Sequence, residues 1–249
     1  TLSQHCDVTY LNEPRGLWNA AYPITDIWSA RAQASGGRLK LTQEDTEEKK
    51  SKLISGLFRQ ETIRNNRPQL IEKLPINSFR LGFINHIFPD ARYIFISRNG
   101  LEVARSIAKL DIGDNWWGFE SYKWKLLRQY AEADPDTNYL PDSCITSEEK
   151  GLLEWRLSTE AVVNFMCTLP TDRYFELNYN QLIESPRLQI KNILQFLKLS
   201  DDSSITQFID NNIKRRTPKL ESYEPNETQR RIGGTTLIRS LSSNYLIQR

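Results

Sequence analysis

Several short runs of apolar residues, without alternating polar residues, occur along this chain and predict its strands. The clearest is Tyr93-Ile94-Phe95-Ile96, four consecutive large apolar residues. Such a run suits a strand covered on both faces, as the parallel strands of α/β domains are. Similar patterns predict strands at Val8 to Leu11, within Leu70 to Pro75, and within Arg173 to Leu182.

Apolar residues at helical spacing follow these runs. Asn99-Gly100 is a turn signal, after which apolar side chains recur every three to four positions through Ala108. Leu152 to Leu169 is predicted to be a long helix, and Ser185-Pro186 supplies an N-cap and first turn for another. The alternation predicts an α/β fold with a mainly parallel sheet flanked by helices.

The segment from about Ala30 to Arg67 is polar and highly charged. Its mixed-sign charges and an apolar stripe at Leu53, Ile54, Leu57 and Phe58 predict a helical insertion. The insertion is interpreted as a structural helix, with a lid over a binding site as the alternative.

A candidate anion site lies where the run at Tyr93 ends. Ligands of open α/β sheets bind at the carboxyl ends of the strands, and Arg98 occupies that position. Ser106 lies about two turns into the following helix. A guanidinium and a hydroxyl that converge there can bind a phosphate. On spacing alone, a surface arginine after a buried strand is an equally good interpretation.

Composition limits the possible classes of protein. The chain has 249 residues, of which 39% are hydrophobic and 26% charged, which is typical of one globular domain. A formal charge of +2, from 33 basic and 31 acidic residues, argues against nucleic acid or an anionic membrane as the main partner. No apolar stretch approaches the ~20 residues of a membrane span, and no signal peptide is visible.

The cysteines predict neither a disulfide framework nor a metal site. Cys6, Cys144 and Cys167 are odd in number and widely separated, and His5 and His86 are the only histidines. We therefore expect unpaired thiols, a reducing and hence cytoplasmic location, and no metal cofactor.

A family resemblance makes the prediction for the anion site more specific. The segment from Phe88 to Gly100, with Ser106 beyond it, resembles the 3′-phosphate-binding segment of sulfotransferases that use 3′-phosphoadenosine-5′-phosphosulfate (PAPS), and the pattern is most similar to the tyrosylprotein and bacterial branches. The resemblance implies that Arg98 and Ser106 hold the 3′-phosphate. It also implies a sulfotransferase fold like that of P-loop NTPases, with PAPS as co-substrate and PAP as product.

Two further segments resemble the catalytic segments of that family. Asn12-Glu13-Pro14-Arg15 is similar to the Glu-Glu-Thr-Arg segment of the tyrosylprotein branch, which makes Glu13 the catalytic base. A carboxylate within hydrogen-bond reach of an acceptor hydroxyl can take its proton; a solvated turn glutamate is the alternative. Lys73, in a Lys-x-Pro sequence similar to the family's Lys-Asp-Pro, is implied to stabilise charge in the transition state.

The resemblance continues to about Leu199. Tyr179 lies in a block similar to the family's Tyr-Glu-x-Leu segment and corresponds to a tyrosine that contacts the nucleotide. Asn12 and Pro14 depart from the pattern of the tyrosylprotein branch. So does Leu110, which stands where that branch has a cofactor arginine.

The phosphosulfate loop is the largest departure. The family's first strand and its 5′-phosphosulfate loop have no counterpart in the sequence, and we expect them to lie upstream of Thr1. Arg231 to Thr236 is reminiscent of the loop, but no apolar run leads into it, so we interpret it as a chance similarity or as a different anion contact. One of two basic clusters, Lys214-Arg215-Arg216 or Arg230-Arg231, is a candidate to close over the 3′-phosphate, and an ordinary basic surface run is the alternative that the sequence leaves open.

These observations predict that residues 1–249 form a single sulfotransferase domain that transfers a sulfuryl group from PAPS to an acceptor hydroxyl. A non-catalytic PAP-binding protein is one alternative. A P-loop kinase is another, although none of the eleven glycines opens a Gly-x-x-x-x-Gly-Lys-Ser/Thr sequence. The aromatic cluster at Trp116 and Trp117 either contacts the acceptor or caps the core, and neither the acceptor nor the oligomeric state follows from the sequence.

Overall fold

The computed structural model describes residues 1–213, 224–242 and 246, and its strands alternate with helices as the patterns predict. The strands are β1 (Val8–Asn12), β2 (Gln69–Lys73), β3 (Tyr93–Ser97) and β4 (Tyr174–Asn178). The α-helices are α1 (Arg15–Ala21), α2 (Glu48–Asn65), α3 (Leu81–Ile87), α4 (Gly100–Asp114), α5 (Tyr122–Glu132), α6 (Ser147–Met166), α7 (Tyr179–Glu184), α8 (Pro186–Leu197), α9 (Ser203–Asn212) and α10 (Glu227–Ser242). None of these helices is long and apolar enough to cross a membrane.

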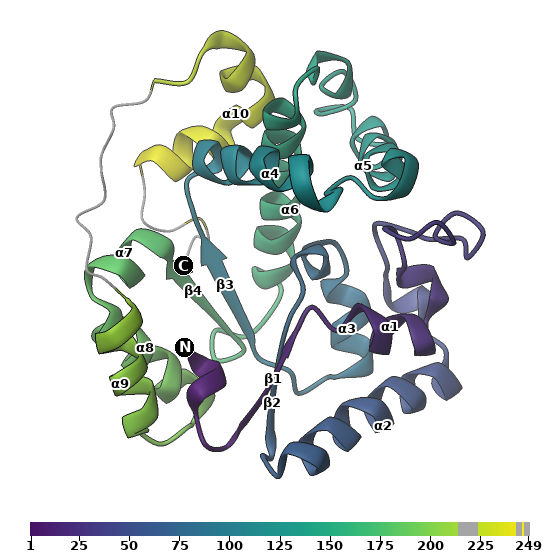
Figure 1. Ribbon diagram of the computed structural model, residues 1–249. Helices are drawn as coiled ribbons and strands as arrows, with labels where there is room; N and C mark the ends of the chain where they lie inside the picture. Colours follow the sequence, from purple (N-terminus) through teal and green to yellow (C-terminus); the bar gives the residue numbers. More distant parts are fainter. Residues whose placement is uncertain (214–223, 243–245, 247–249) are drawn as a thin grey trace.

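The predicted parallel sheet is divided into two pairs of strands. β1 pairs in parallel with β2, and Asn12 lies opposite Lys73. β3 pairs in parallel with β4, and Ser97 lies opposite Asn178. Among the described residues no ladder joins the two pairs, and Figure 1 shows them as separate ribbons whose strands run the same way.

Helices cover the two faces of the strands unequally. The larger core includes α3, α4 and α6 and packs on Tyr93 of β3. A smaller core joins Leu177 of β4 to α8 and α9. Coverage is incomplete at Ile96, which is 54% exposed although it lies within β3. The prediction that this strand is covered on both faces therefore holds only in part, because Ile96 borders a large cavity instead of packed side chains.

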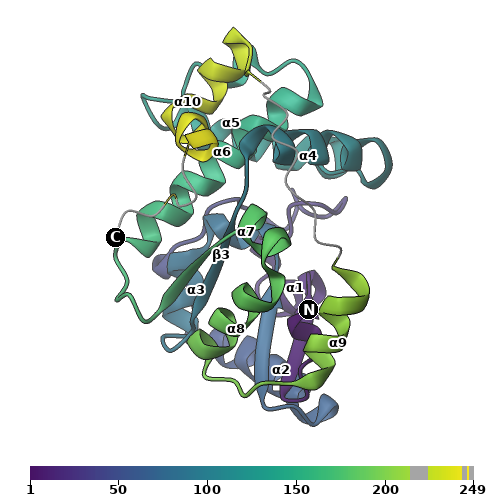
Figure 2. The same ribbon diagram turned by 90° about the vertical axis from the view of Figure 1, so that its left-hand side faces the viewer.

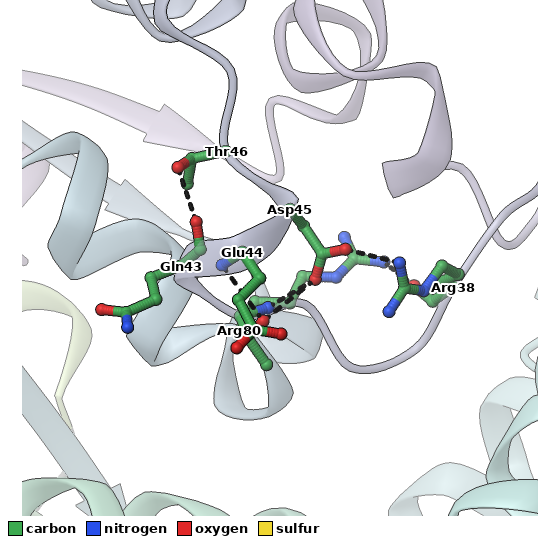
Figure 3. Close-up of polar contacts among 7 residues, drawn as sticks. Arg38, Gln43, Glu44, Asp45, Thr46 and Arg80 are labelled. Carbon is green, nitrogen blue, oxygen red and sulfur yellow. Dashed lines mark hydrogen bonds and ion pairs between the residues drawn. The ribbon is translucent and has the colours of Figure 1, made fainter.

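The segment predicted as a helical insertion is helical only from Glu48 to Asn65. Before it, the chain forms turns and a short 3-10 helix, Gln43–Asp45. A capping box between Thr42 and Asp45 caps the N-terminal end of this helix. Short polar side chains that bond their own backbone in this way favour turns over helix. Arg80 lies beneath this loop with its guanidinium buried, and it donates to the carbonyl groups of Arg38 and Leu39 (Figure 3).

Candidate active site at the carboxyl ends of the strands

The parallel register of β1 and β2 brings Glu13 and Lys73 together. Glu13 directly follows β1, and its backbone N–H donates to the carbonyl oxygen of Lys73 at 2.7 Å. The Lys73 ammonium lies 2.7 Å from the Glu13 carboxylate. Two residues that are sixty positions apart in the sequence thus form an ion pair. The pair lies where the resemblance places a base and a charge-stabilising lysine.

Arg15 binds the other oxygen of the same carboxylate. Its guanidinium donates to Glu13 Oε2 at 2.7 Å and lies 4.0 Å from the centre of the Trp28 ring. Glu13 has a φ of 51°, which is uncommon for a residue with a side chain and typical of a tight turn. The turn and the two cations together hold the carboxylate in place.

The ionisation state of Glu13 follows from these contacts. Partial burial raises the pKa of the carboxyl group, but hydrogen bonds and charges from Lys73 and Arg15 outweigh it, and the pKa lies below its ordinary value. Glu13 is therefore ionised at neutral pH. A carboxylate in this state can accept a proton once a substrate displaces one of its two cations.

The second pair of strands brings Arg98 and Tyr179 together. Ser97 lies opposite Asn178, so the residues that follow the two strands are neighbours. The Arg98 guanidinium lies 4.4 Å from the centre of the Tyr179 ring, a cation–π contact. Its Nε donates to the Glu102 carboxylate at 2.8 Å.

The turn after β3 is defined by Asn99 and Gly100. The Asn99 side chain accepts hydrogen bonds from the backbone N–H groups of Leu101 and Glu102 and caps α4. A Cβ atom at Gly100 would lie 2.5 Å from the Trp155 ring on α6, which explains the glycine. The close approach of α4 to α6 sets the position of the strand end that carries Arg98.

A cavity of about 1490 Å³ joins the two residue pairs. Lys73, Arg98 and Ser106 all line it, and so does Leu110. Ser106 is exposed on the same helix that begins beside Arg98. Three of the five predicted site residues therefore face one cavity, and Glu13 and Tyr179 contact two of those three directly.

A buried ionic cluster at the same cavity has no counterpart in the sequence-based prediction. Lys123, which is 2% exposed, lies 2.6 Å from the Glu154 carboxylate, whose second oxygen accepts a hydrogen bond from Trp116 Nε1 at 2.7 Å. Glu154 and Trp116 line the cavity. Desolvation lowers the pKa of Lys123, and Glu154 opposes that shift. The sequence signal that could have revealed this cluster is a lysine and a glutamate that each lie on an otherwise apolar face of a helix.

The two tryptophans of the aromatic cluster have different roles. Trp117 is 4% exposed and packs against Trp124 in the core, whereas Trp116 lines the cavity. The sequence left both interpretations open. The structure assigns the core to Trp117 and a cavity wall to Trp116.

The remaining sequence features lie elsewhere. Arg231 to Thr236, the segment reminiscent of a phosphosulfate loop, lies inside α10. Arg230 forms an ion pair with Glu224 at 3.5 Å, and the cluster Lys214 to Arg216 lies outside the described residues, so closure over a phosphate stays a prediction.

The three cysteines, all in described ranges, are unpaired, as expected. One of them, Cys6, lies near His5 and Asp202 in an arrangement that could hold a metal ion. Both ring nitrogens of His5 already have backbone partners, Ser200 O and Asp7 N, each at 3.0 Å. The group also lies at the amino end of β1, away from the candidate active site.

Comparisons with known proteins identify the family of the chain and its fold. A model described as the sulfotransferase family matches residues 25–203, a range that contains Lys73, Arg98, Ser106 and Tyr179. A solved structure described as "Sulfotransferase Domain from the Curacin Biosynthetic Pathway" aligns with a TM-score of 0.54 at 11% identity, over 94% of this chain and 90% of that one, and shows the same fold. Another, "Sulfotransferase Domain from the Synechococcus PCC 7002 Olefin Synthase", aligns with a TM-score of 0.45 at 18% identity, over 97% and 89% of the two chains. No curated protein sequence matches significantly. Because the family model covers more than half of its residues, the chain belongs to the sulfotransferase family.

Proposed function

We propose that this sulfotransferase transfers the sulfuryl group of PAPS to an acceptor hydroxyl, with Glu13 as the base. The main observation that supports the proposal is that two contacting residue pairs lie at the same cavity. Glu13 and Lys73 lie at the carboxyl ends of β1 and β2, and Arg98 and Tyr179 lie at the ends of β3 and β4. One pair suits proton and charge transfer, and the other suits an anionic nucleotide.

In the proposed reaction the acceptor oxygen forms a bond to sulfur in line with the bond from sulfur to the bridging oxygen, which breaks and leaves PAP. The acceptor proton passes to the Glu13 carboxylate. Lys73 exchanges its contact with Glu13 for the oxygens around sulfur, where negative charge grows. Transfer of this kind needs positioning and positive charge more than covalent chemistry from the protein.

That exchange also activates the base. While Lys73 contacts Glu13, the pKa of the carboxyl group is held down. When Lys73 turns to the donor, the pKa of Glu13 rises and the carboxylate becomes a stronger base. Binding of the donor thereby prepares Glu13 to take the acceptor proton.

On the nucleotide side, Arg98 and Ser106 are proposed to bind the 3′-phosphate, and the Tyr179 ring, 4.4 Å from the guanidinium, helps to position it. Glu102 occupies Arg98 Nε at 2.8 Å, which leaves the terminal nitrogens of the guanidinium for a phosphate. Bidentate binding through a planar guanidinium is a strong and geometrically specific phosphate contact.

The test is incubation of the protein with PAPS that carries ³⁵S in its sulfuryl group, across a panel of phenols, sugars, lipids and acyl-carrier hydroxyls. We expect labelled product from one class of acceptor. The Glu13→Gln variant should form none of it. Transfer of label from γ-³²P-ATP instead would indicate a kinase and contradict the proposal.

A nucleotide-binding protein without turnover is the second candidate. It is favoured by the occupation of both Glu13 oxygens, which two cations hold at 2.7 Å each. Calorimetry with PAP decides between the two candidates. Tight PAP binding with no sulfated product across the acceptor panel would identify a binder.

A further inference from the structure

The ion pair between Arg15 and Glu13 lies at the surface. Arg15 is the first residue of α1, which begins beside the carboxyl end of β1 (Figure 1, Figure 2). The side chains of Arg15 and Glu13 are 43% and 28% exposed. Ion pairs at such exposure are weak, because two long side chains lose rotamer freedom and water screens their charges. An arginine that keeps one orientation there needs a further support.

That support is the side chain of Trp28. The guanidinium carbon of Arg15 lies 4.0 Å from the centre of the Trp28 ring. A cation over an aromatic face is attracted by the electrons of the ring, and tryptophan gives the strongest contact of this kind. The contact restricts the guanidinium while its Nη2 donates to Glu13 Oε2 at 2.7 Å.

The backbone of Trp28 is itself held from two sides. On one side, the Asp26 carboxylate accepts hydrogen bonds from the N–H groups of Trp28 at 3.0 Å and Ser29 at 3.1 Å, and Asp26 is only 8% exposed. On the other side, the carbonyl oxygen of Trp28 accepts from the N–H of Phe119 at 2.9 Å. The tertiary structure therefore fixes the residue that supports Arg15.

Gly118 permits the second of these contacts. Its φ of 78° lies in the left-handed region that favours glycine. A Cβ atom at this position would lie 2.7 Å from the carbonyl oxygen of Ile27 and 3.3 Å from the Cα atom of Trp28. The segment before α5 can approach Trp28 this closely because residue 118 has no side chain.

The two cations that bind Glu13 therefore differ in how firmly they are held. The Lys73 side chain is 51% exposed, and within the described part of the chain its ammonium donates only to Glu13 Oε1, at 2.7 Å. Arg15 is held by Glu13 and by Trp28 together. Oε1 is thus the oxygen that is released when Lys73 moves, and Oε2 stays bound.

We propose that Trp28 is a positioning residue for the base: it holds Arg15 on Oε2 of Glu13 and so directs Oε1 toward the acceptor hydroxyl. The inference rests on the proposed function. In the transfer the acceptor oxygen bonds to sulfur as its proton bonds to Oε1, and the bond from sulfur to the bridging oxygen of PAPS breaks. A carboxylate free to rotate would lose the alignment that this proton transfer needs.

Charged groups act on Glu13 from three elements. Partial burial raises the pKa of Glu13, but the contacts with Lys73 of β2 and Arg15 of α1 outweigh it and lower the pKa. Lys123 of α5 is the third group. Burial lowers the pKa of Lys123, its partner Glu154 opposes that shift, and the charges of Arg15 and Glu13 have smaller, opposite effects on it. Release of Arg15 alone should therefore raise the pKa of Glu13.

The experiment measures the pKa of Glu13 by carbon NMR, on the full chain with ¹³C-labelled glutamate side chains and no substrate. A Glu13→Gln variant identifies the signal. Trp28→Leu should raise the pKa of Glu13, because no ring then holds Arg15 on Oε2. Trp28→Phe keeps an aromatic face and should raise it less. An unchanged pKa in Trp28→Leu overturns the proposal.

Arg15→Gln is the matched control. It should raise the pKa of Glu13 at least as much as Trp28→Leu does. Adding Trp28→Leu to Arg15→Gln should then change the pKa no further, because the ring acts through the guanidinium. A further rise as large as that in the wild-type background would overturn the proposal. If Trp28→Leu does not fold, Trp28→Phe takes its place in the same comparison.

Turnover gives a second readout. With saturating PAPS, kcat of Trp28→Leu should fall by about tenfold to a hundredfold through misalignment of the base, and Trp28→Phe should recover most of it. The KM for PAPS should be retained, and a change in that KM alone would contradict a positioning role. Absence of sulfuryl transfer by the wild-type chain would refute the proposed function, whereas the NMR comparison still decides whether Trp28 holds Arg15 on Glu13.

Discussion

The Arg98 guanidinium lies over the Tyr179 ring, 4.4 Å from its centre, although the two residues stand at the ends of different strands. The contact exists because Ser97 and Asn178 are directly opposed in a parallel pair. Arg98 directly follows Ser97, and Tyr179 directly follows Asn178. A register shift of one residue would direct Arg98 to the other face and separate the two.

This arrangement makes a prediction about nucleotide selectivity. Arg98→Ala should weaken binding of PAP by about tenfold to a hundredfold, since a charge-assisted hydrogen bond contributes roughly 1.5–3 kcal/mol. Binding of the analogue that lacks the 3′-phosphate should change little. Calorimetry with both nucleotides measures the difference, and equal losses would contradict a 3′-phosphate role.

A Glu102→Gln variant serves as the control for that measurement. It removes the negative charge 2.8 Å from Arg98 Nε but leaves the guanidinium in place. PAP affinity should be kept or raised, because the competing carboxylate is gone. A loss as large as that of Arg98→Ala would show that the alanine variant acts through the ion pair.

Lys73→Ala is expected to lower kcat by about two to three orders of magnitude. Removing an electrostatic donor to a transition state typically costs ~2.7–4 kcal/mol in the barrier. PAP binding should be far less affected, because Arg98 and Ser106 hold the nucleotide. Single-turnover kinetics with saturating PAPS separates the two effects, and an unchanged rate would remove Lys73 from the mechanism.

The pH profile tests Glu13 as the base. Lys73 and Arg15 hold the pKa of Glu13 below the ordinary 4.5. The acid limb of the pH profile of kcat/KM should therefore have its midpoint below pH 4.5. Lys73→Ala removes one of these cations, so the limb should move to higher pH. A limb near neutral pH, or the same limb in Glu13→Gln, would assign proton transfer to another group.

The Lys123–Glu154 pair predicts a non-additive effect on stability. Glu154→Gln alone leaves an uncompensated ammonium that is 2% exposed, and such single losses cost about 3–5 kcal/mol. Combining it with Lys123→Met removes the charge and should restore much of that loss. Urea unfolding of the two single variants and the double variant measures the coupling, and additive losses would show that the pair is not coupled.

Cys144 predicts a loss of stability at alkaline pH. Burial raises the pKa of its thiol from 9.0 to about 12, so between these values the unfolded chain loses a proton that the folded chain keeps. The free energy of unfolding should therefore fall by up to about 1.4 kcal/mol per pH unit from this group. Cys144→Ala should flatten the slope, whereas Cys167→Ala, an exposed position, should leave it unchanged.

The strands and the residues that follow them were predictable because their signals are local. Apolar runs placed β2 and β3 within one or two residues, and the turn chemistry of Asn99 and Gly100 placed the start of α4. The segment before Glu48 was predicted wrongly as helix, because hydrogen bonds that the Thr42 and Asp45 side chains accept from nearby backbone N–H groups outweigh its helical charge pattern.

The sequence by itself determined the order of elements and the residues at the strand ends, because periodicity and turn signals depend on neighbours in the chain. Only the tertiary structure decided that Glu13 contacts Lys73, that Lys123 lies buried beside Glu154, and that no ladder joins β2 to β3 within the described part of the chain. Register, burial and strand neighbours depend on segments far apart in the sequence. Their free energies come from packing and desolvation, which no local pattern records.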